Sequence, residues 1–318
     1  MAISLRDMKA AHARALADIP AAAAHGPGTV TRFRPKSRPR GLDLDLPNLR
    51  LRLDAETGVL RAQMLHRERA CYTPAIMRDM RHAQMHIRDV VASHGADAEP
   101  FRYLVWASAA PRAWSLGGDL ATFTRMIREG DEIGLREYAH LAIDILHDNL
   151  VSLDLPILTI ALIQGDAIGG GFEAMLTDDV VIAERGAKFG MPEILFDLFP
   201  GMGGYSFLRR KVGPALARRL LEDGVTREAD ELKALGLVDV VCDSGAGEAA
   251  LERFVADNDR RFHTLLTLKR VRDRADPLTK RELVEIVDMW VDLAMRLGEP
   301  QLRRMDCLAR VQERTRAV

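Results

Sequence analysis

Short apolar runs alternate with longer helical patterns along much of this chain. Residues 49–53 and 59–64 have a strand-like pattern, and residues 101–107 are rich in β-branched and aromatic side chains, which predicts a further strand. Residues 74–94 predict a helix, because apolar side chains recur there with a helical period. These side chains are Ile76, Met77, Met80, Met85 and Ile87. A long helical region is expected over about 131–152.

The middle of the chain predicts strands that are buried on both faces. Residues 156–163 are nearly all apolar, and residues 179–183 form another apolar strand. Glycines at 165 and 169–171 end the first of these strands and begin a short helix. Helices are expected from 204 onward, so the alternation of strands and helices indicates one α/β core.

The two ends of the chain differ from this core. Residues 1–45 are interpreted as an N-terminal appendage, in which a weak helical pattern over 5–24 precedes a Pro-broken basic linker over 31–40. The α/β core is expected over 46–247, and 248–318 is expected to form a helical C-terminal region. The basic stretch could be a solvated linker or a landing patch for an acidic carrier.

Composition and charge narrow the classes of function. The 318 residues are 47% hydrophobic, and 45 basic side chains nearly balance 46 acidic ones. This balance removes the usual electrostatic basis for broad binding to nucleic acid or a membrane surface. Three cysteines without metal-ligand spacing predict no metal site, and no cofactor is expected. The N-terminus lacks a signal-peptide pattern and no apolar run could span a bilayer, so a cytoplasmic protein is expected.

Two glycine turns are candidates for an oxyanion-binding site. The glycines at 169–171 lie between a predicted strand and helix, where backbone N–H groups can point at an oxygen that gains negative charge. Residues 116–119 have the same construction. Gly118 and Gly170 could therefore donate to one thioester carbonyl, although a single glycine at a strand end usually only supplies a special backbone angle.

Glu173 and Glu193 are the candidate acid–base groups. Both have apolar neighbours in the sequence, and such surroundings raise a carboxyl pKa toward the range useful for proton transfer. Each also has a structural explanation, because Glu173 suits the first turn of a helix and Glu193 suits a helix start after Pro192. No serine lies in a nucleophile elbow, so serine-hydrolase chemistry is not expected.

Five segments together resemble the crotonase (enoyl-CoA hydratase/isomerase) superfamily. They follow the family's order within about residues 46–260: SLGGDL at 115–120, GDAIGGGFE at 165–173, FGMPE at 189–193, PGMGG at 200–204 and ADELKALGLVD at 229–239. The resemblance implies an α/β crotonase fold of stacked ββα units with a helical C-terminal region. It also implies that Gly118 and Gly170 form the oxyanion hole and that Glu173 and Glu193 match the two catalytic glutamates of hydratase-type members.

Two departures from ordinary enoyl-CoA hydratases resemble the diffusible-signal-factor synthases of bacterial quorum sensing. These departures are the RACYTP segment at 69–74 and the N-terminal appendage. The resemblance implies dehydration of a 3-hydroxyacyl group on acyl carrier protein, followed by thioester hydrolysis that releases a cis-2-unsaturated fatty acid. Two carboxylates suit this dehydration, with Glu193 removing the α-proton and protonated Glu173 assisting departure of the hydroxyl; the reverse assignment stays open.

The same branch implies an apolar pocket for the acyl chain. By approximate position, the pocket residues would be Ile168, Gly169, Met202, Trp290 and Leu308. Trp290 and Leu308 could equally be ordinary core residues. The helical region after about 248 resembles the part through which crotonases form trimers, so a homotrimer or hexamer is expected.

Two other functions stay open from the sequence. The first is an enoyl-CoA hydratase or CoA thioesterase of fatty-acid metabolism, which would prefer CoA to a carrier protein. The second is a non-catalytic crotonase relative that binds a partner such as a sensor kinase. Retention of both glutamates and both glycine turns argues against a loss of catalysis.

Overall fold

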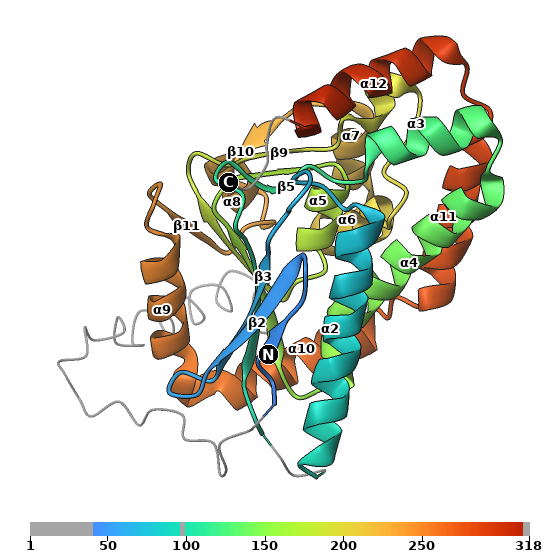
Figure 1. The fold of residues 1–318 in the computed structure, drawn as a ribbon. Helices are drawn as coiled ribbons and strands as arrows, with labels where there is room; N and C mark the ends of the chain where they lie inside the picture. Colours follow the sequence, from blue (N-terminus) through green and yellow to red (C-terminus); the bar gives the residue numbers. More distant parts are fainter. Residues whose placement is uncertain (1–40, 96–98, 314–318) are drawn as a thin grey trace, which may run out of the picture. The chain divides into compact units, whose positions relative to one another are not determined.

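The structure of this protein is a computed structural model that describes residues 41–95 and 99–313. The predicted helical pattern over 5–24 and the basic linker over 31–40 lie outside the described residues. Two sheets and the helices around them form the described part (Figure 1). Within that part, no helix is both long and apolar enough to cross a membrane.

The larger sheet has seven strands in the order β1-β2-β3-β4-β6-β8-β11. The five strands from β3 to β11 are parallel, and β2 and β1 extend the sheet in antiparallel fashion. The bounds of these strands are β1 Leu44–Asp45, β2 Leu49–Asp54, β3 Val59–Met64, β4 Tyr103–Ser108, β6 Leu158–Ile163, β8 Val180–Glu184 and β11 Val240–Cys242.

Eleven α-helices and three short 3-10 helices accompany the strands of the described chain. The 3-10 helices are η1 Ser152–Asp154, η2 Pro192–Phe196 and η3 Asp259–Arg261. The α-helices are α2 Pro74–Ser93, α3 Leu120–Glu129, α4 Glu132–Leu150, α5 Gly170–Met175, α6 Gly204–Val212, α7 Pro214–Glu222, α8 Ala229–Ala234, α9 Gly247–Asn258, α10 Phe262–Ala275, α11 Lys280–Ala294 and α12 Glu299–Glu313.

Strands β4 and β6 are buried on both faces of the larger sheet. In β4, Leu104 and Trp106 pack into the apolar cluster shared with α2 and α4, whereas Tyr103 and Val105 pack into the cluster shared with α9 and α10. All six residues of β6 are buried. Successive side chains of a strand point to opposite faces, so a strand covered by helices on both sides has no polar alternation. The α/β fold predicted from the apolar runs is confirmed.

Helix α2 begins one residue after Thr73, whose side chain accepts a hydrogen bond from Ile76 N at 3.4 Å. Proline at the first helical position suits this start, because a first-turn N–H has no intrahelical acceptor. Met85, which the helical period grouped with four other apolar residues, is 51% exposed. Its neighbour Gln84 is buried instead, where its side-chain amide donates to Ile145 O at 2.9 Å.

The smaller sheet has four strands in the order β10-β9-β7-β5. Its strands are only two or three residues long, and β5, β7 and β9 run parallel to one another. Their bounds are β5 Ala113–Ser115, β7 Asp166–Ile168, β9 Lys188–Gly190 and β10 Arg227–Glu228. Such short strands show no recognisable period in the sequence, so this sheet was not predicted.

Candidate active site

The three parallel strands of the smaller sheet place all three sequence-predicted catalytic segments at one edge. Strand β5 leads into the turn at Gly117 and Gly118, β7 leads into the glycines that begin α5, and β9 leads into η2, which contains Glu193. The carboxyl ends of parallel strands meet at the same edge of a sheet, where α/β proteins commonly bind ligands. Sheet topology therefore brings together Gly117 and Glu193, which lie 76 positions apart in the sequence.

The two glycine turns touch each other through their backbones. Gly117 has a φ of +82°, a conformation that residues with a Cβ rarely adopt. A Cβ on Gly117 would lie only 2.7 Å from Gly170 N and 2.8 Å from Ile168 O. The close approach of the two turns therefore requires glycine at position 117.

The amides of Gly118 and Gly170 are available to a ligand. Tyr72 N donates to Gly117 O at 2.7 Å, and a trans peptide points its N–H away from its C=O, so Gly118 N–H points away from Tyr72. Gly170 is the first residue of α5, where an N–H has no acceptor within the helix. Neither amide donates a hydrogen bond to any other residue in the described chain.

Glu173 is a buried carboxyl in the first turn of α5, with only 1% of the residue exposed. Its Oε1 accepts a hydrogen bond of 2.8 Å from Gly204 N, at the start of α6. Burial raises the pKa of Glu173, and the negative charge of Glu193 raises it further. The amide of Gly204 acts in the opposite direction, but its effect is smaller.

Glu193 lies in the first turn of η2, after Pro192. The residue as a whole is half-buried, but Oε2 is shielded from solvent and has no hydrogen-bond partner among the described residues. Its Oε1 lies beside Gly169, where a Cβ would come within 2.7 Å of that oxygen. Burial raises the pKa of this carboxyl as well. Two buried acids whose charges repel each other favour a state in which the pair keeps a proton at neutral pH.

A cavity of about 230 Å³ joins the two turns and the two carboxyls. Apolar side chains form most of its wall, as expected for a site that holds an acyl chain. All nine sequence-predicted site residues line it: Gly118, Ile168, Gly169, Gly170, Glu173, Glu193, Met202, Trp290 and Leu308. The structure brings these residues together, and their roles stay predictions.

Trp290 and Leu308 reach the cavity from two C-terminal helices. Trp290, on α11, is 7% exposed and packs edge-to-face against Phe123, with ring centroids 5.2 Å apart. Leu308 lies on α12, in the half-buried layer around the main apolar cluster. Both residues therefore line the cavity and contact the core, so the two interpretations of them are compatible.

Other residues of the cavity wall were not predicted from the sequence. Phe123 and Tyr138 come from α3 and α4, and Val311 and Gln312 come from the last turn of α12. The helical period of residues 299–313 indicates a helix, but it does not indicate which part of the fold this helix covers. Among the described residues, no group of three or more His, Cys, Asp or Glu side chains could hold a metal ion.

Comparison with known families agrees with this site. The model of the enoyl-CoA hydratase/isomerase family matches residues 90–255, more than half of the 318-residue chain. This protein therefore belongs to the enoyl-CoA hydratase/isomerase family. The match includes the two glycine turns and both glutamates.

Curated relatives resemble part of the chain. The chain is 32% identical to the mitochondrial methylglutaconyl-CoA hydratase of Rattus norvegicus over 161 residues. The matched stretch covers 51% of this chain and 49% of that protein. The chain is 48% identical over 80 residues to a probable enoyl-CoA hydratase of Mycobacterium tuberculosis, covering 25% of this chain and 31% of the relative. The chain thus spans about half or less of the length of these relatives.

Solved structures resemble a larger share of the chain. The enoyl-CoA hydratase of Bacillus halodurans has a TM-score of 0.68 at 19% identity and covers 82% of this chain and 99% of its own. DspI of Pseudomonas aeruginosa has a TM-score of 0.59 at 25% identity, with 78% and 96% covered. The first likeness confirms the crotonase fold.

Proposed function

We propose that this protein removes water from a 3-hydroxyacyl thioester and then hydrolyses the thioester to release a cis-2-unsaturated fatty acid. One observation carries the proposal: one apolar cavity is lined by two shielded carboxyls and by two glycines whose backbone amides donate to no other described residue. The amides suit a thioester oxygen, the carboxyls suit proton transfer at the neighbouring carbons, and the apolar wall suits the acyl chain.

In the dehydration step, Gly118 N–H and Gly170 N–H donate to the thioester oxygen. Glu193, as the carboxylate, takes the α-proton, and the electron pair of the C–H bond forms an enolate that the two amides stabilise. Protonated Glu173 then gives its proton to the 3-hydroxyl, the C–O bond breaks and water leaves. Burial raises the pKa of both carboxyls, but the negative charge of Glu193 raises the pKa of Glu173 further, which favours Glu173 as the acid.

In the hydrolysis step, the same groups act on water. A carboxylate of the pair accepts a proton from water while the water oxygen adds to the thioester carbon. The oxygen of the tetrahedral intermediate lies between the two amides, as the enolate oxygen did. The C–S bond then breaks, and the proton passes to the departing thiolate, so that a free acid and a thiol result.

We propose that acyl carrier protein supplies the acyl group and that the released acid serves as a quorum-sensing signal. Support for this finer assignment comes from the sequence of residues 69–74, which resembles the diffusible-signal-factor synthases. In the structure this segment contacts the turn at residues 116–119, here called the oxyanion turn, because Tyr72 N donates to Gly117 O. The similarity to relatives named as CoA hydratases favours a second candidate, hydration of 2-enoyl-CoA.

Matched substrates distinguish the two candidates. The purified full chain is given 3-hydroxyacyl-CoA and 3-hydroxyacyl carrier protein over one series of chain lengths, and mass spectrometry detects thioesters and released acids. The proposal predicts a cis-2-enoic acid, formed faster from the carrier protein. A product that stays on CoA identifies a hydratase, and no conversion of any thioester excludes both functions.

The raised pKa values of the two glutamates predict a bell-shaped pH profile. Activity needs one carboxylate and one protonated carboxyl, so kcat/KM falls in acid as the base is protonated and falls in alkali as the pair loses its last proton. Burial raises both pKa values. The acid limb should therefore lie above about 4.3, the ordinary pKa of glutamate. A profile whose acid limb lies at that ordinary value would contradict the proposed electrostatics.

A further inference from the structure

The C-terminal helix α12 reaches the oxyanion turn through one buried side chain, that of Gln312. This residue is 4% exposed, although it lies in the last turn of the helix. Its Nε2 donates to Leu116 O at 3.0 Å and to Gly118 O at 2.8 Å, and its Oε1 accepts from Leu120 N at 3.3 Å. One amide therefore bonds to the backbone on both sides of Gly117.

Hydrogen bonds from two sides hold the peptide planes around the Gly118 amide. The C=O of Gly117 is held by Tyr72 N, and the C=O groups of Leu116 and Gly118 are both held by Gln312. Three consecutive carbonyls are thus fixed from two sides of the turn. Glycine at 117 has no side chain to restrict its backbone rotation, so the neighbouring peptide planes depend on such external contacts to keep the Gly118 N–H in place.

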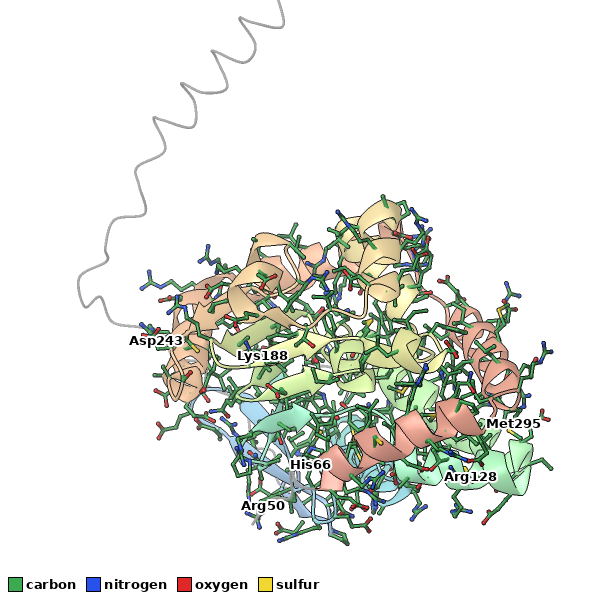
Figure 2. All side chains as sticks on the ribbon, turned by 90° about the horizontal axis from the view of Figure 1, so that it is seen from above. Arg50, His66, Arg128, Lys188, Asp243 and Met295 are labelled. Atoms are coloured by element: carbon green, nitrogen blue, oxygen red, sulfur yellow. The ribbon has the colours of Figure 1, made fainter. Side chains whose placement is uncertain are left out.

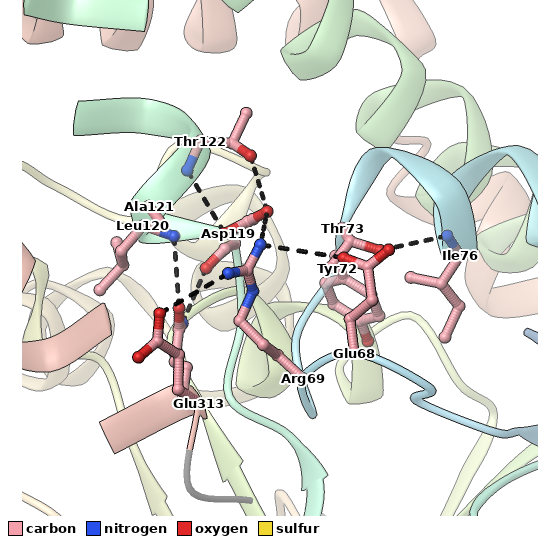
Figure 3. A network of polar contacts seen from close by, with 12 residues as sticks. Glu68, Arg69, Tyr72, Thr73, Ile76, Asp119, Leu120, Ala121, Thr122 and Glu313 are labelled. Carbon is pink, nitrogen blue, oxygen red and sulfur yellow. Dashed lines mark hydrogen bonds and ion pairs between the residues drawn. The ribbon is translucent and has the colours of Figure 1, made fainter. Parts of the chain in front are cut away.

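Ion pairs hold α12 beside α3, the helix that follows the oxyanion turn. Arg128 lies near the end of α3 (Figure 2). Its guanidinium pairs with Glu299 at 3.0 Å and with Asp306 at 2.8 Å. Near the other end of α12, Arg69 lies 3.0 Å from Asp119, the N-cap residue of α3, and 3.9 Å from Glu313 (Figure 3). Helix α12 is therefore held by ion pairs near both ends of α3.

The same helix also contacts the segment that contains Glu193. The side-chain amide of Gln301 donates to Asp197 Oδ2 at 2.7 Å, and Arg304 donates to Leu195 O at 3.2 Å. Helix α12 thus bridges the oxyanion turn and the η2 segment. Of all these contacts, only those of Gln312 touch the carbonyls next to the candidate oxyanion donor.

We infer that Gln312 is a positioning residue of the oxyanion hole, which makes α12 a working part of the active site. The inference rests on the proposed function, because it assigns Gly118 N–H to the thioester oxygen. Gln312 acts through Leu116 and Gly118 and does not itself bond to the reacting oxygen. Its loss should weaken stabilisation of the enolate more than it weakens binding of the acyl thioester.

Two substitutions separate this role from simple helix attachment. Gln312→Met keeps the length of the side chain and removes every hydrogen bond. Gln312→Glu can still accept from Leu120 N but cannot donate to the two carbonyls. Both variants should lower kcat by about 10- to 100-fold, which is less than the 10²–10³-fold loss typical when an oxyanion donor is removed outright, and should change the dissociation constant of the thioester by less than about threefold.

The matched control is Gln301→Ala. This change removes the hydrogen bond of another side-chain amide on the same helix, and it does not affect the oxyanion turn. It should keep kcat near the wild-type value. A 3-oxoacyl-CoA probe adds a spectroscopic measurement, because its enolate absorbs at a different wavelength from its keto form. The wild-type protein should increase the bound enolate fraction, and both Gln312 variants should increase it less.

The outcomes distinguish this inference from the proposed function. If the wild-type protein converts no acyl thioester and does not favour the enolate, the proposed function fails. If the wild-type protein is active and the Gln312 variants match it in kcat and in enolate fraction, the inference about Gln312 is wrong. Equal losses in Gln312→Glu and Gln301→Ala, in kcat and affinity alike, would also overturn it, because they would show general loosening of the helix.

Discussion

Replacing Glu173 or Glu193 with Gln should lower release of the unsaturated acid by about 10²–10⁴-fold, the usual contribution of one acid–base group. Gln keeps the volume and polarity of each side chain, so the fold should persist. In Glu173→Gln, the amide oxygen can still accept from Gly204 N, as Glu173 Oε1 does at 2.8 Å. Single-turnover kinetics with a 3-hydroxyacyl thioester measures the loss separately from product release.

Asp178→Asn is the matched control for this experiment. Asp178 lies on the segment that follows α5, and burial raises its pKa to about 8. Like the two glutamates, it is a buried carboxyl that can hold a proton. It accepts a hydrogen bond from Asn149 Nδ2 at 3.1 Å and does not line the catalytic cavity. Activity in Asp178→Asn should stay within about threefold of wild type. Full activity in either glutamate variant would exclude the acid–base mechanism.

Gly117→Ala should separate the two halves of the oxyanion hole. The new Cβ would meet Gly170 N and Ile168 O at 2.7 and 2.8 Å, and backbone atoms cannot rotate away as a flexible side chain can. A Cβ at this positive φ costs about 1–3 kcal/mol, and overpacking costs about 1–3 kcal/mol more. We therefore expect a loss of about 2–6 kcal/mol in the free energy of unfolding and a loss of at least about 10²-fold in kcat.

Gly130→Ala provides the control for backbone strain without a steric clash. Gly130 ends α3 with a φ of +69°, and a Cβ there would meet no atom within 4 Å. This variant should lose about 1 kcal/mol of stability, as alanine commonly does in the left-handed region, and should keep its activity. Chemical denaturation and steady-state kinetics measure both effects. If Gly117→Ala behaves like Gly130→Ala, the two turns are not in the contact described above.

Much of this fold could be predicted from the sequence because its main strands are long and apolar. Residues 156–163 contain β6, whose two buried faces leave no polar alternation, and residues 74–94 contain α2 with its Thr73 cap. The candidate catalytic residues could be chosen because motifs in several segments coincided. Neither Glu173 nor Glu193 would have been distinctive alone, because both also suit the start of a helix.

The parts that could not be predicted depend on long-range contacts. Strands β5, β7 and β9 have three residues each, too few to show a period of two, yet their parallel pairing sets the geometry of the site. Gln312 resembles any polar residue near the end of an amphipathic helix until its distance to Gly118 O is known. Contacts between residues 194 positions apart are fixed by packing, and a single sequence does not record them.

The proposed oxyanion donors, Gly118 and Gly170, belong to the main chain, which has a consequence for how the proposed activity can change during evolution. A substitution at Glu173 or Glu193 removes an acid–base group, but it leaves the amides of Gly118 and Gly170 in place. Such a variant would still capture and polarise an acyl thioester without converting it. A single mutation would therefore convert the enzyme into a protein that binds its substrate without converting it. Such a protein is also a starting point from which a different proton-transfer reaction can be selected.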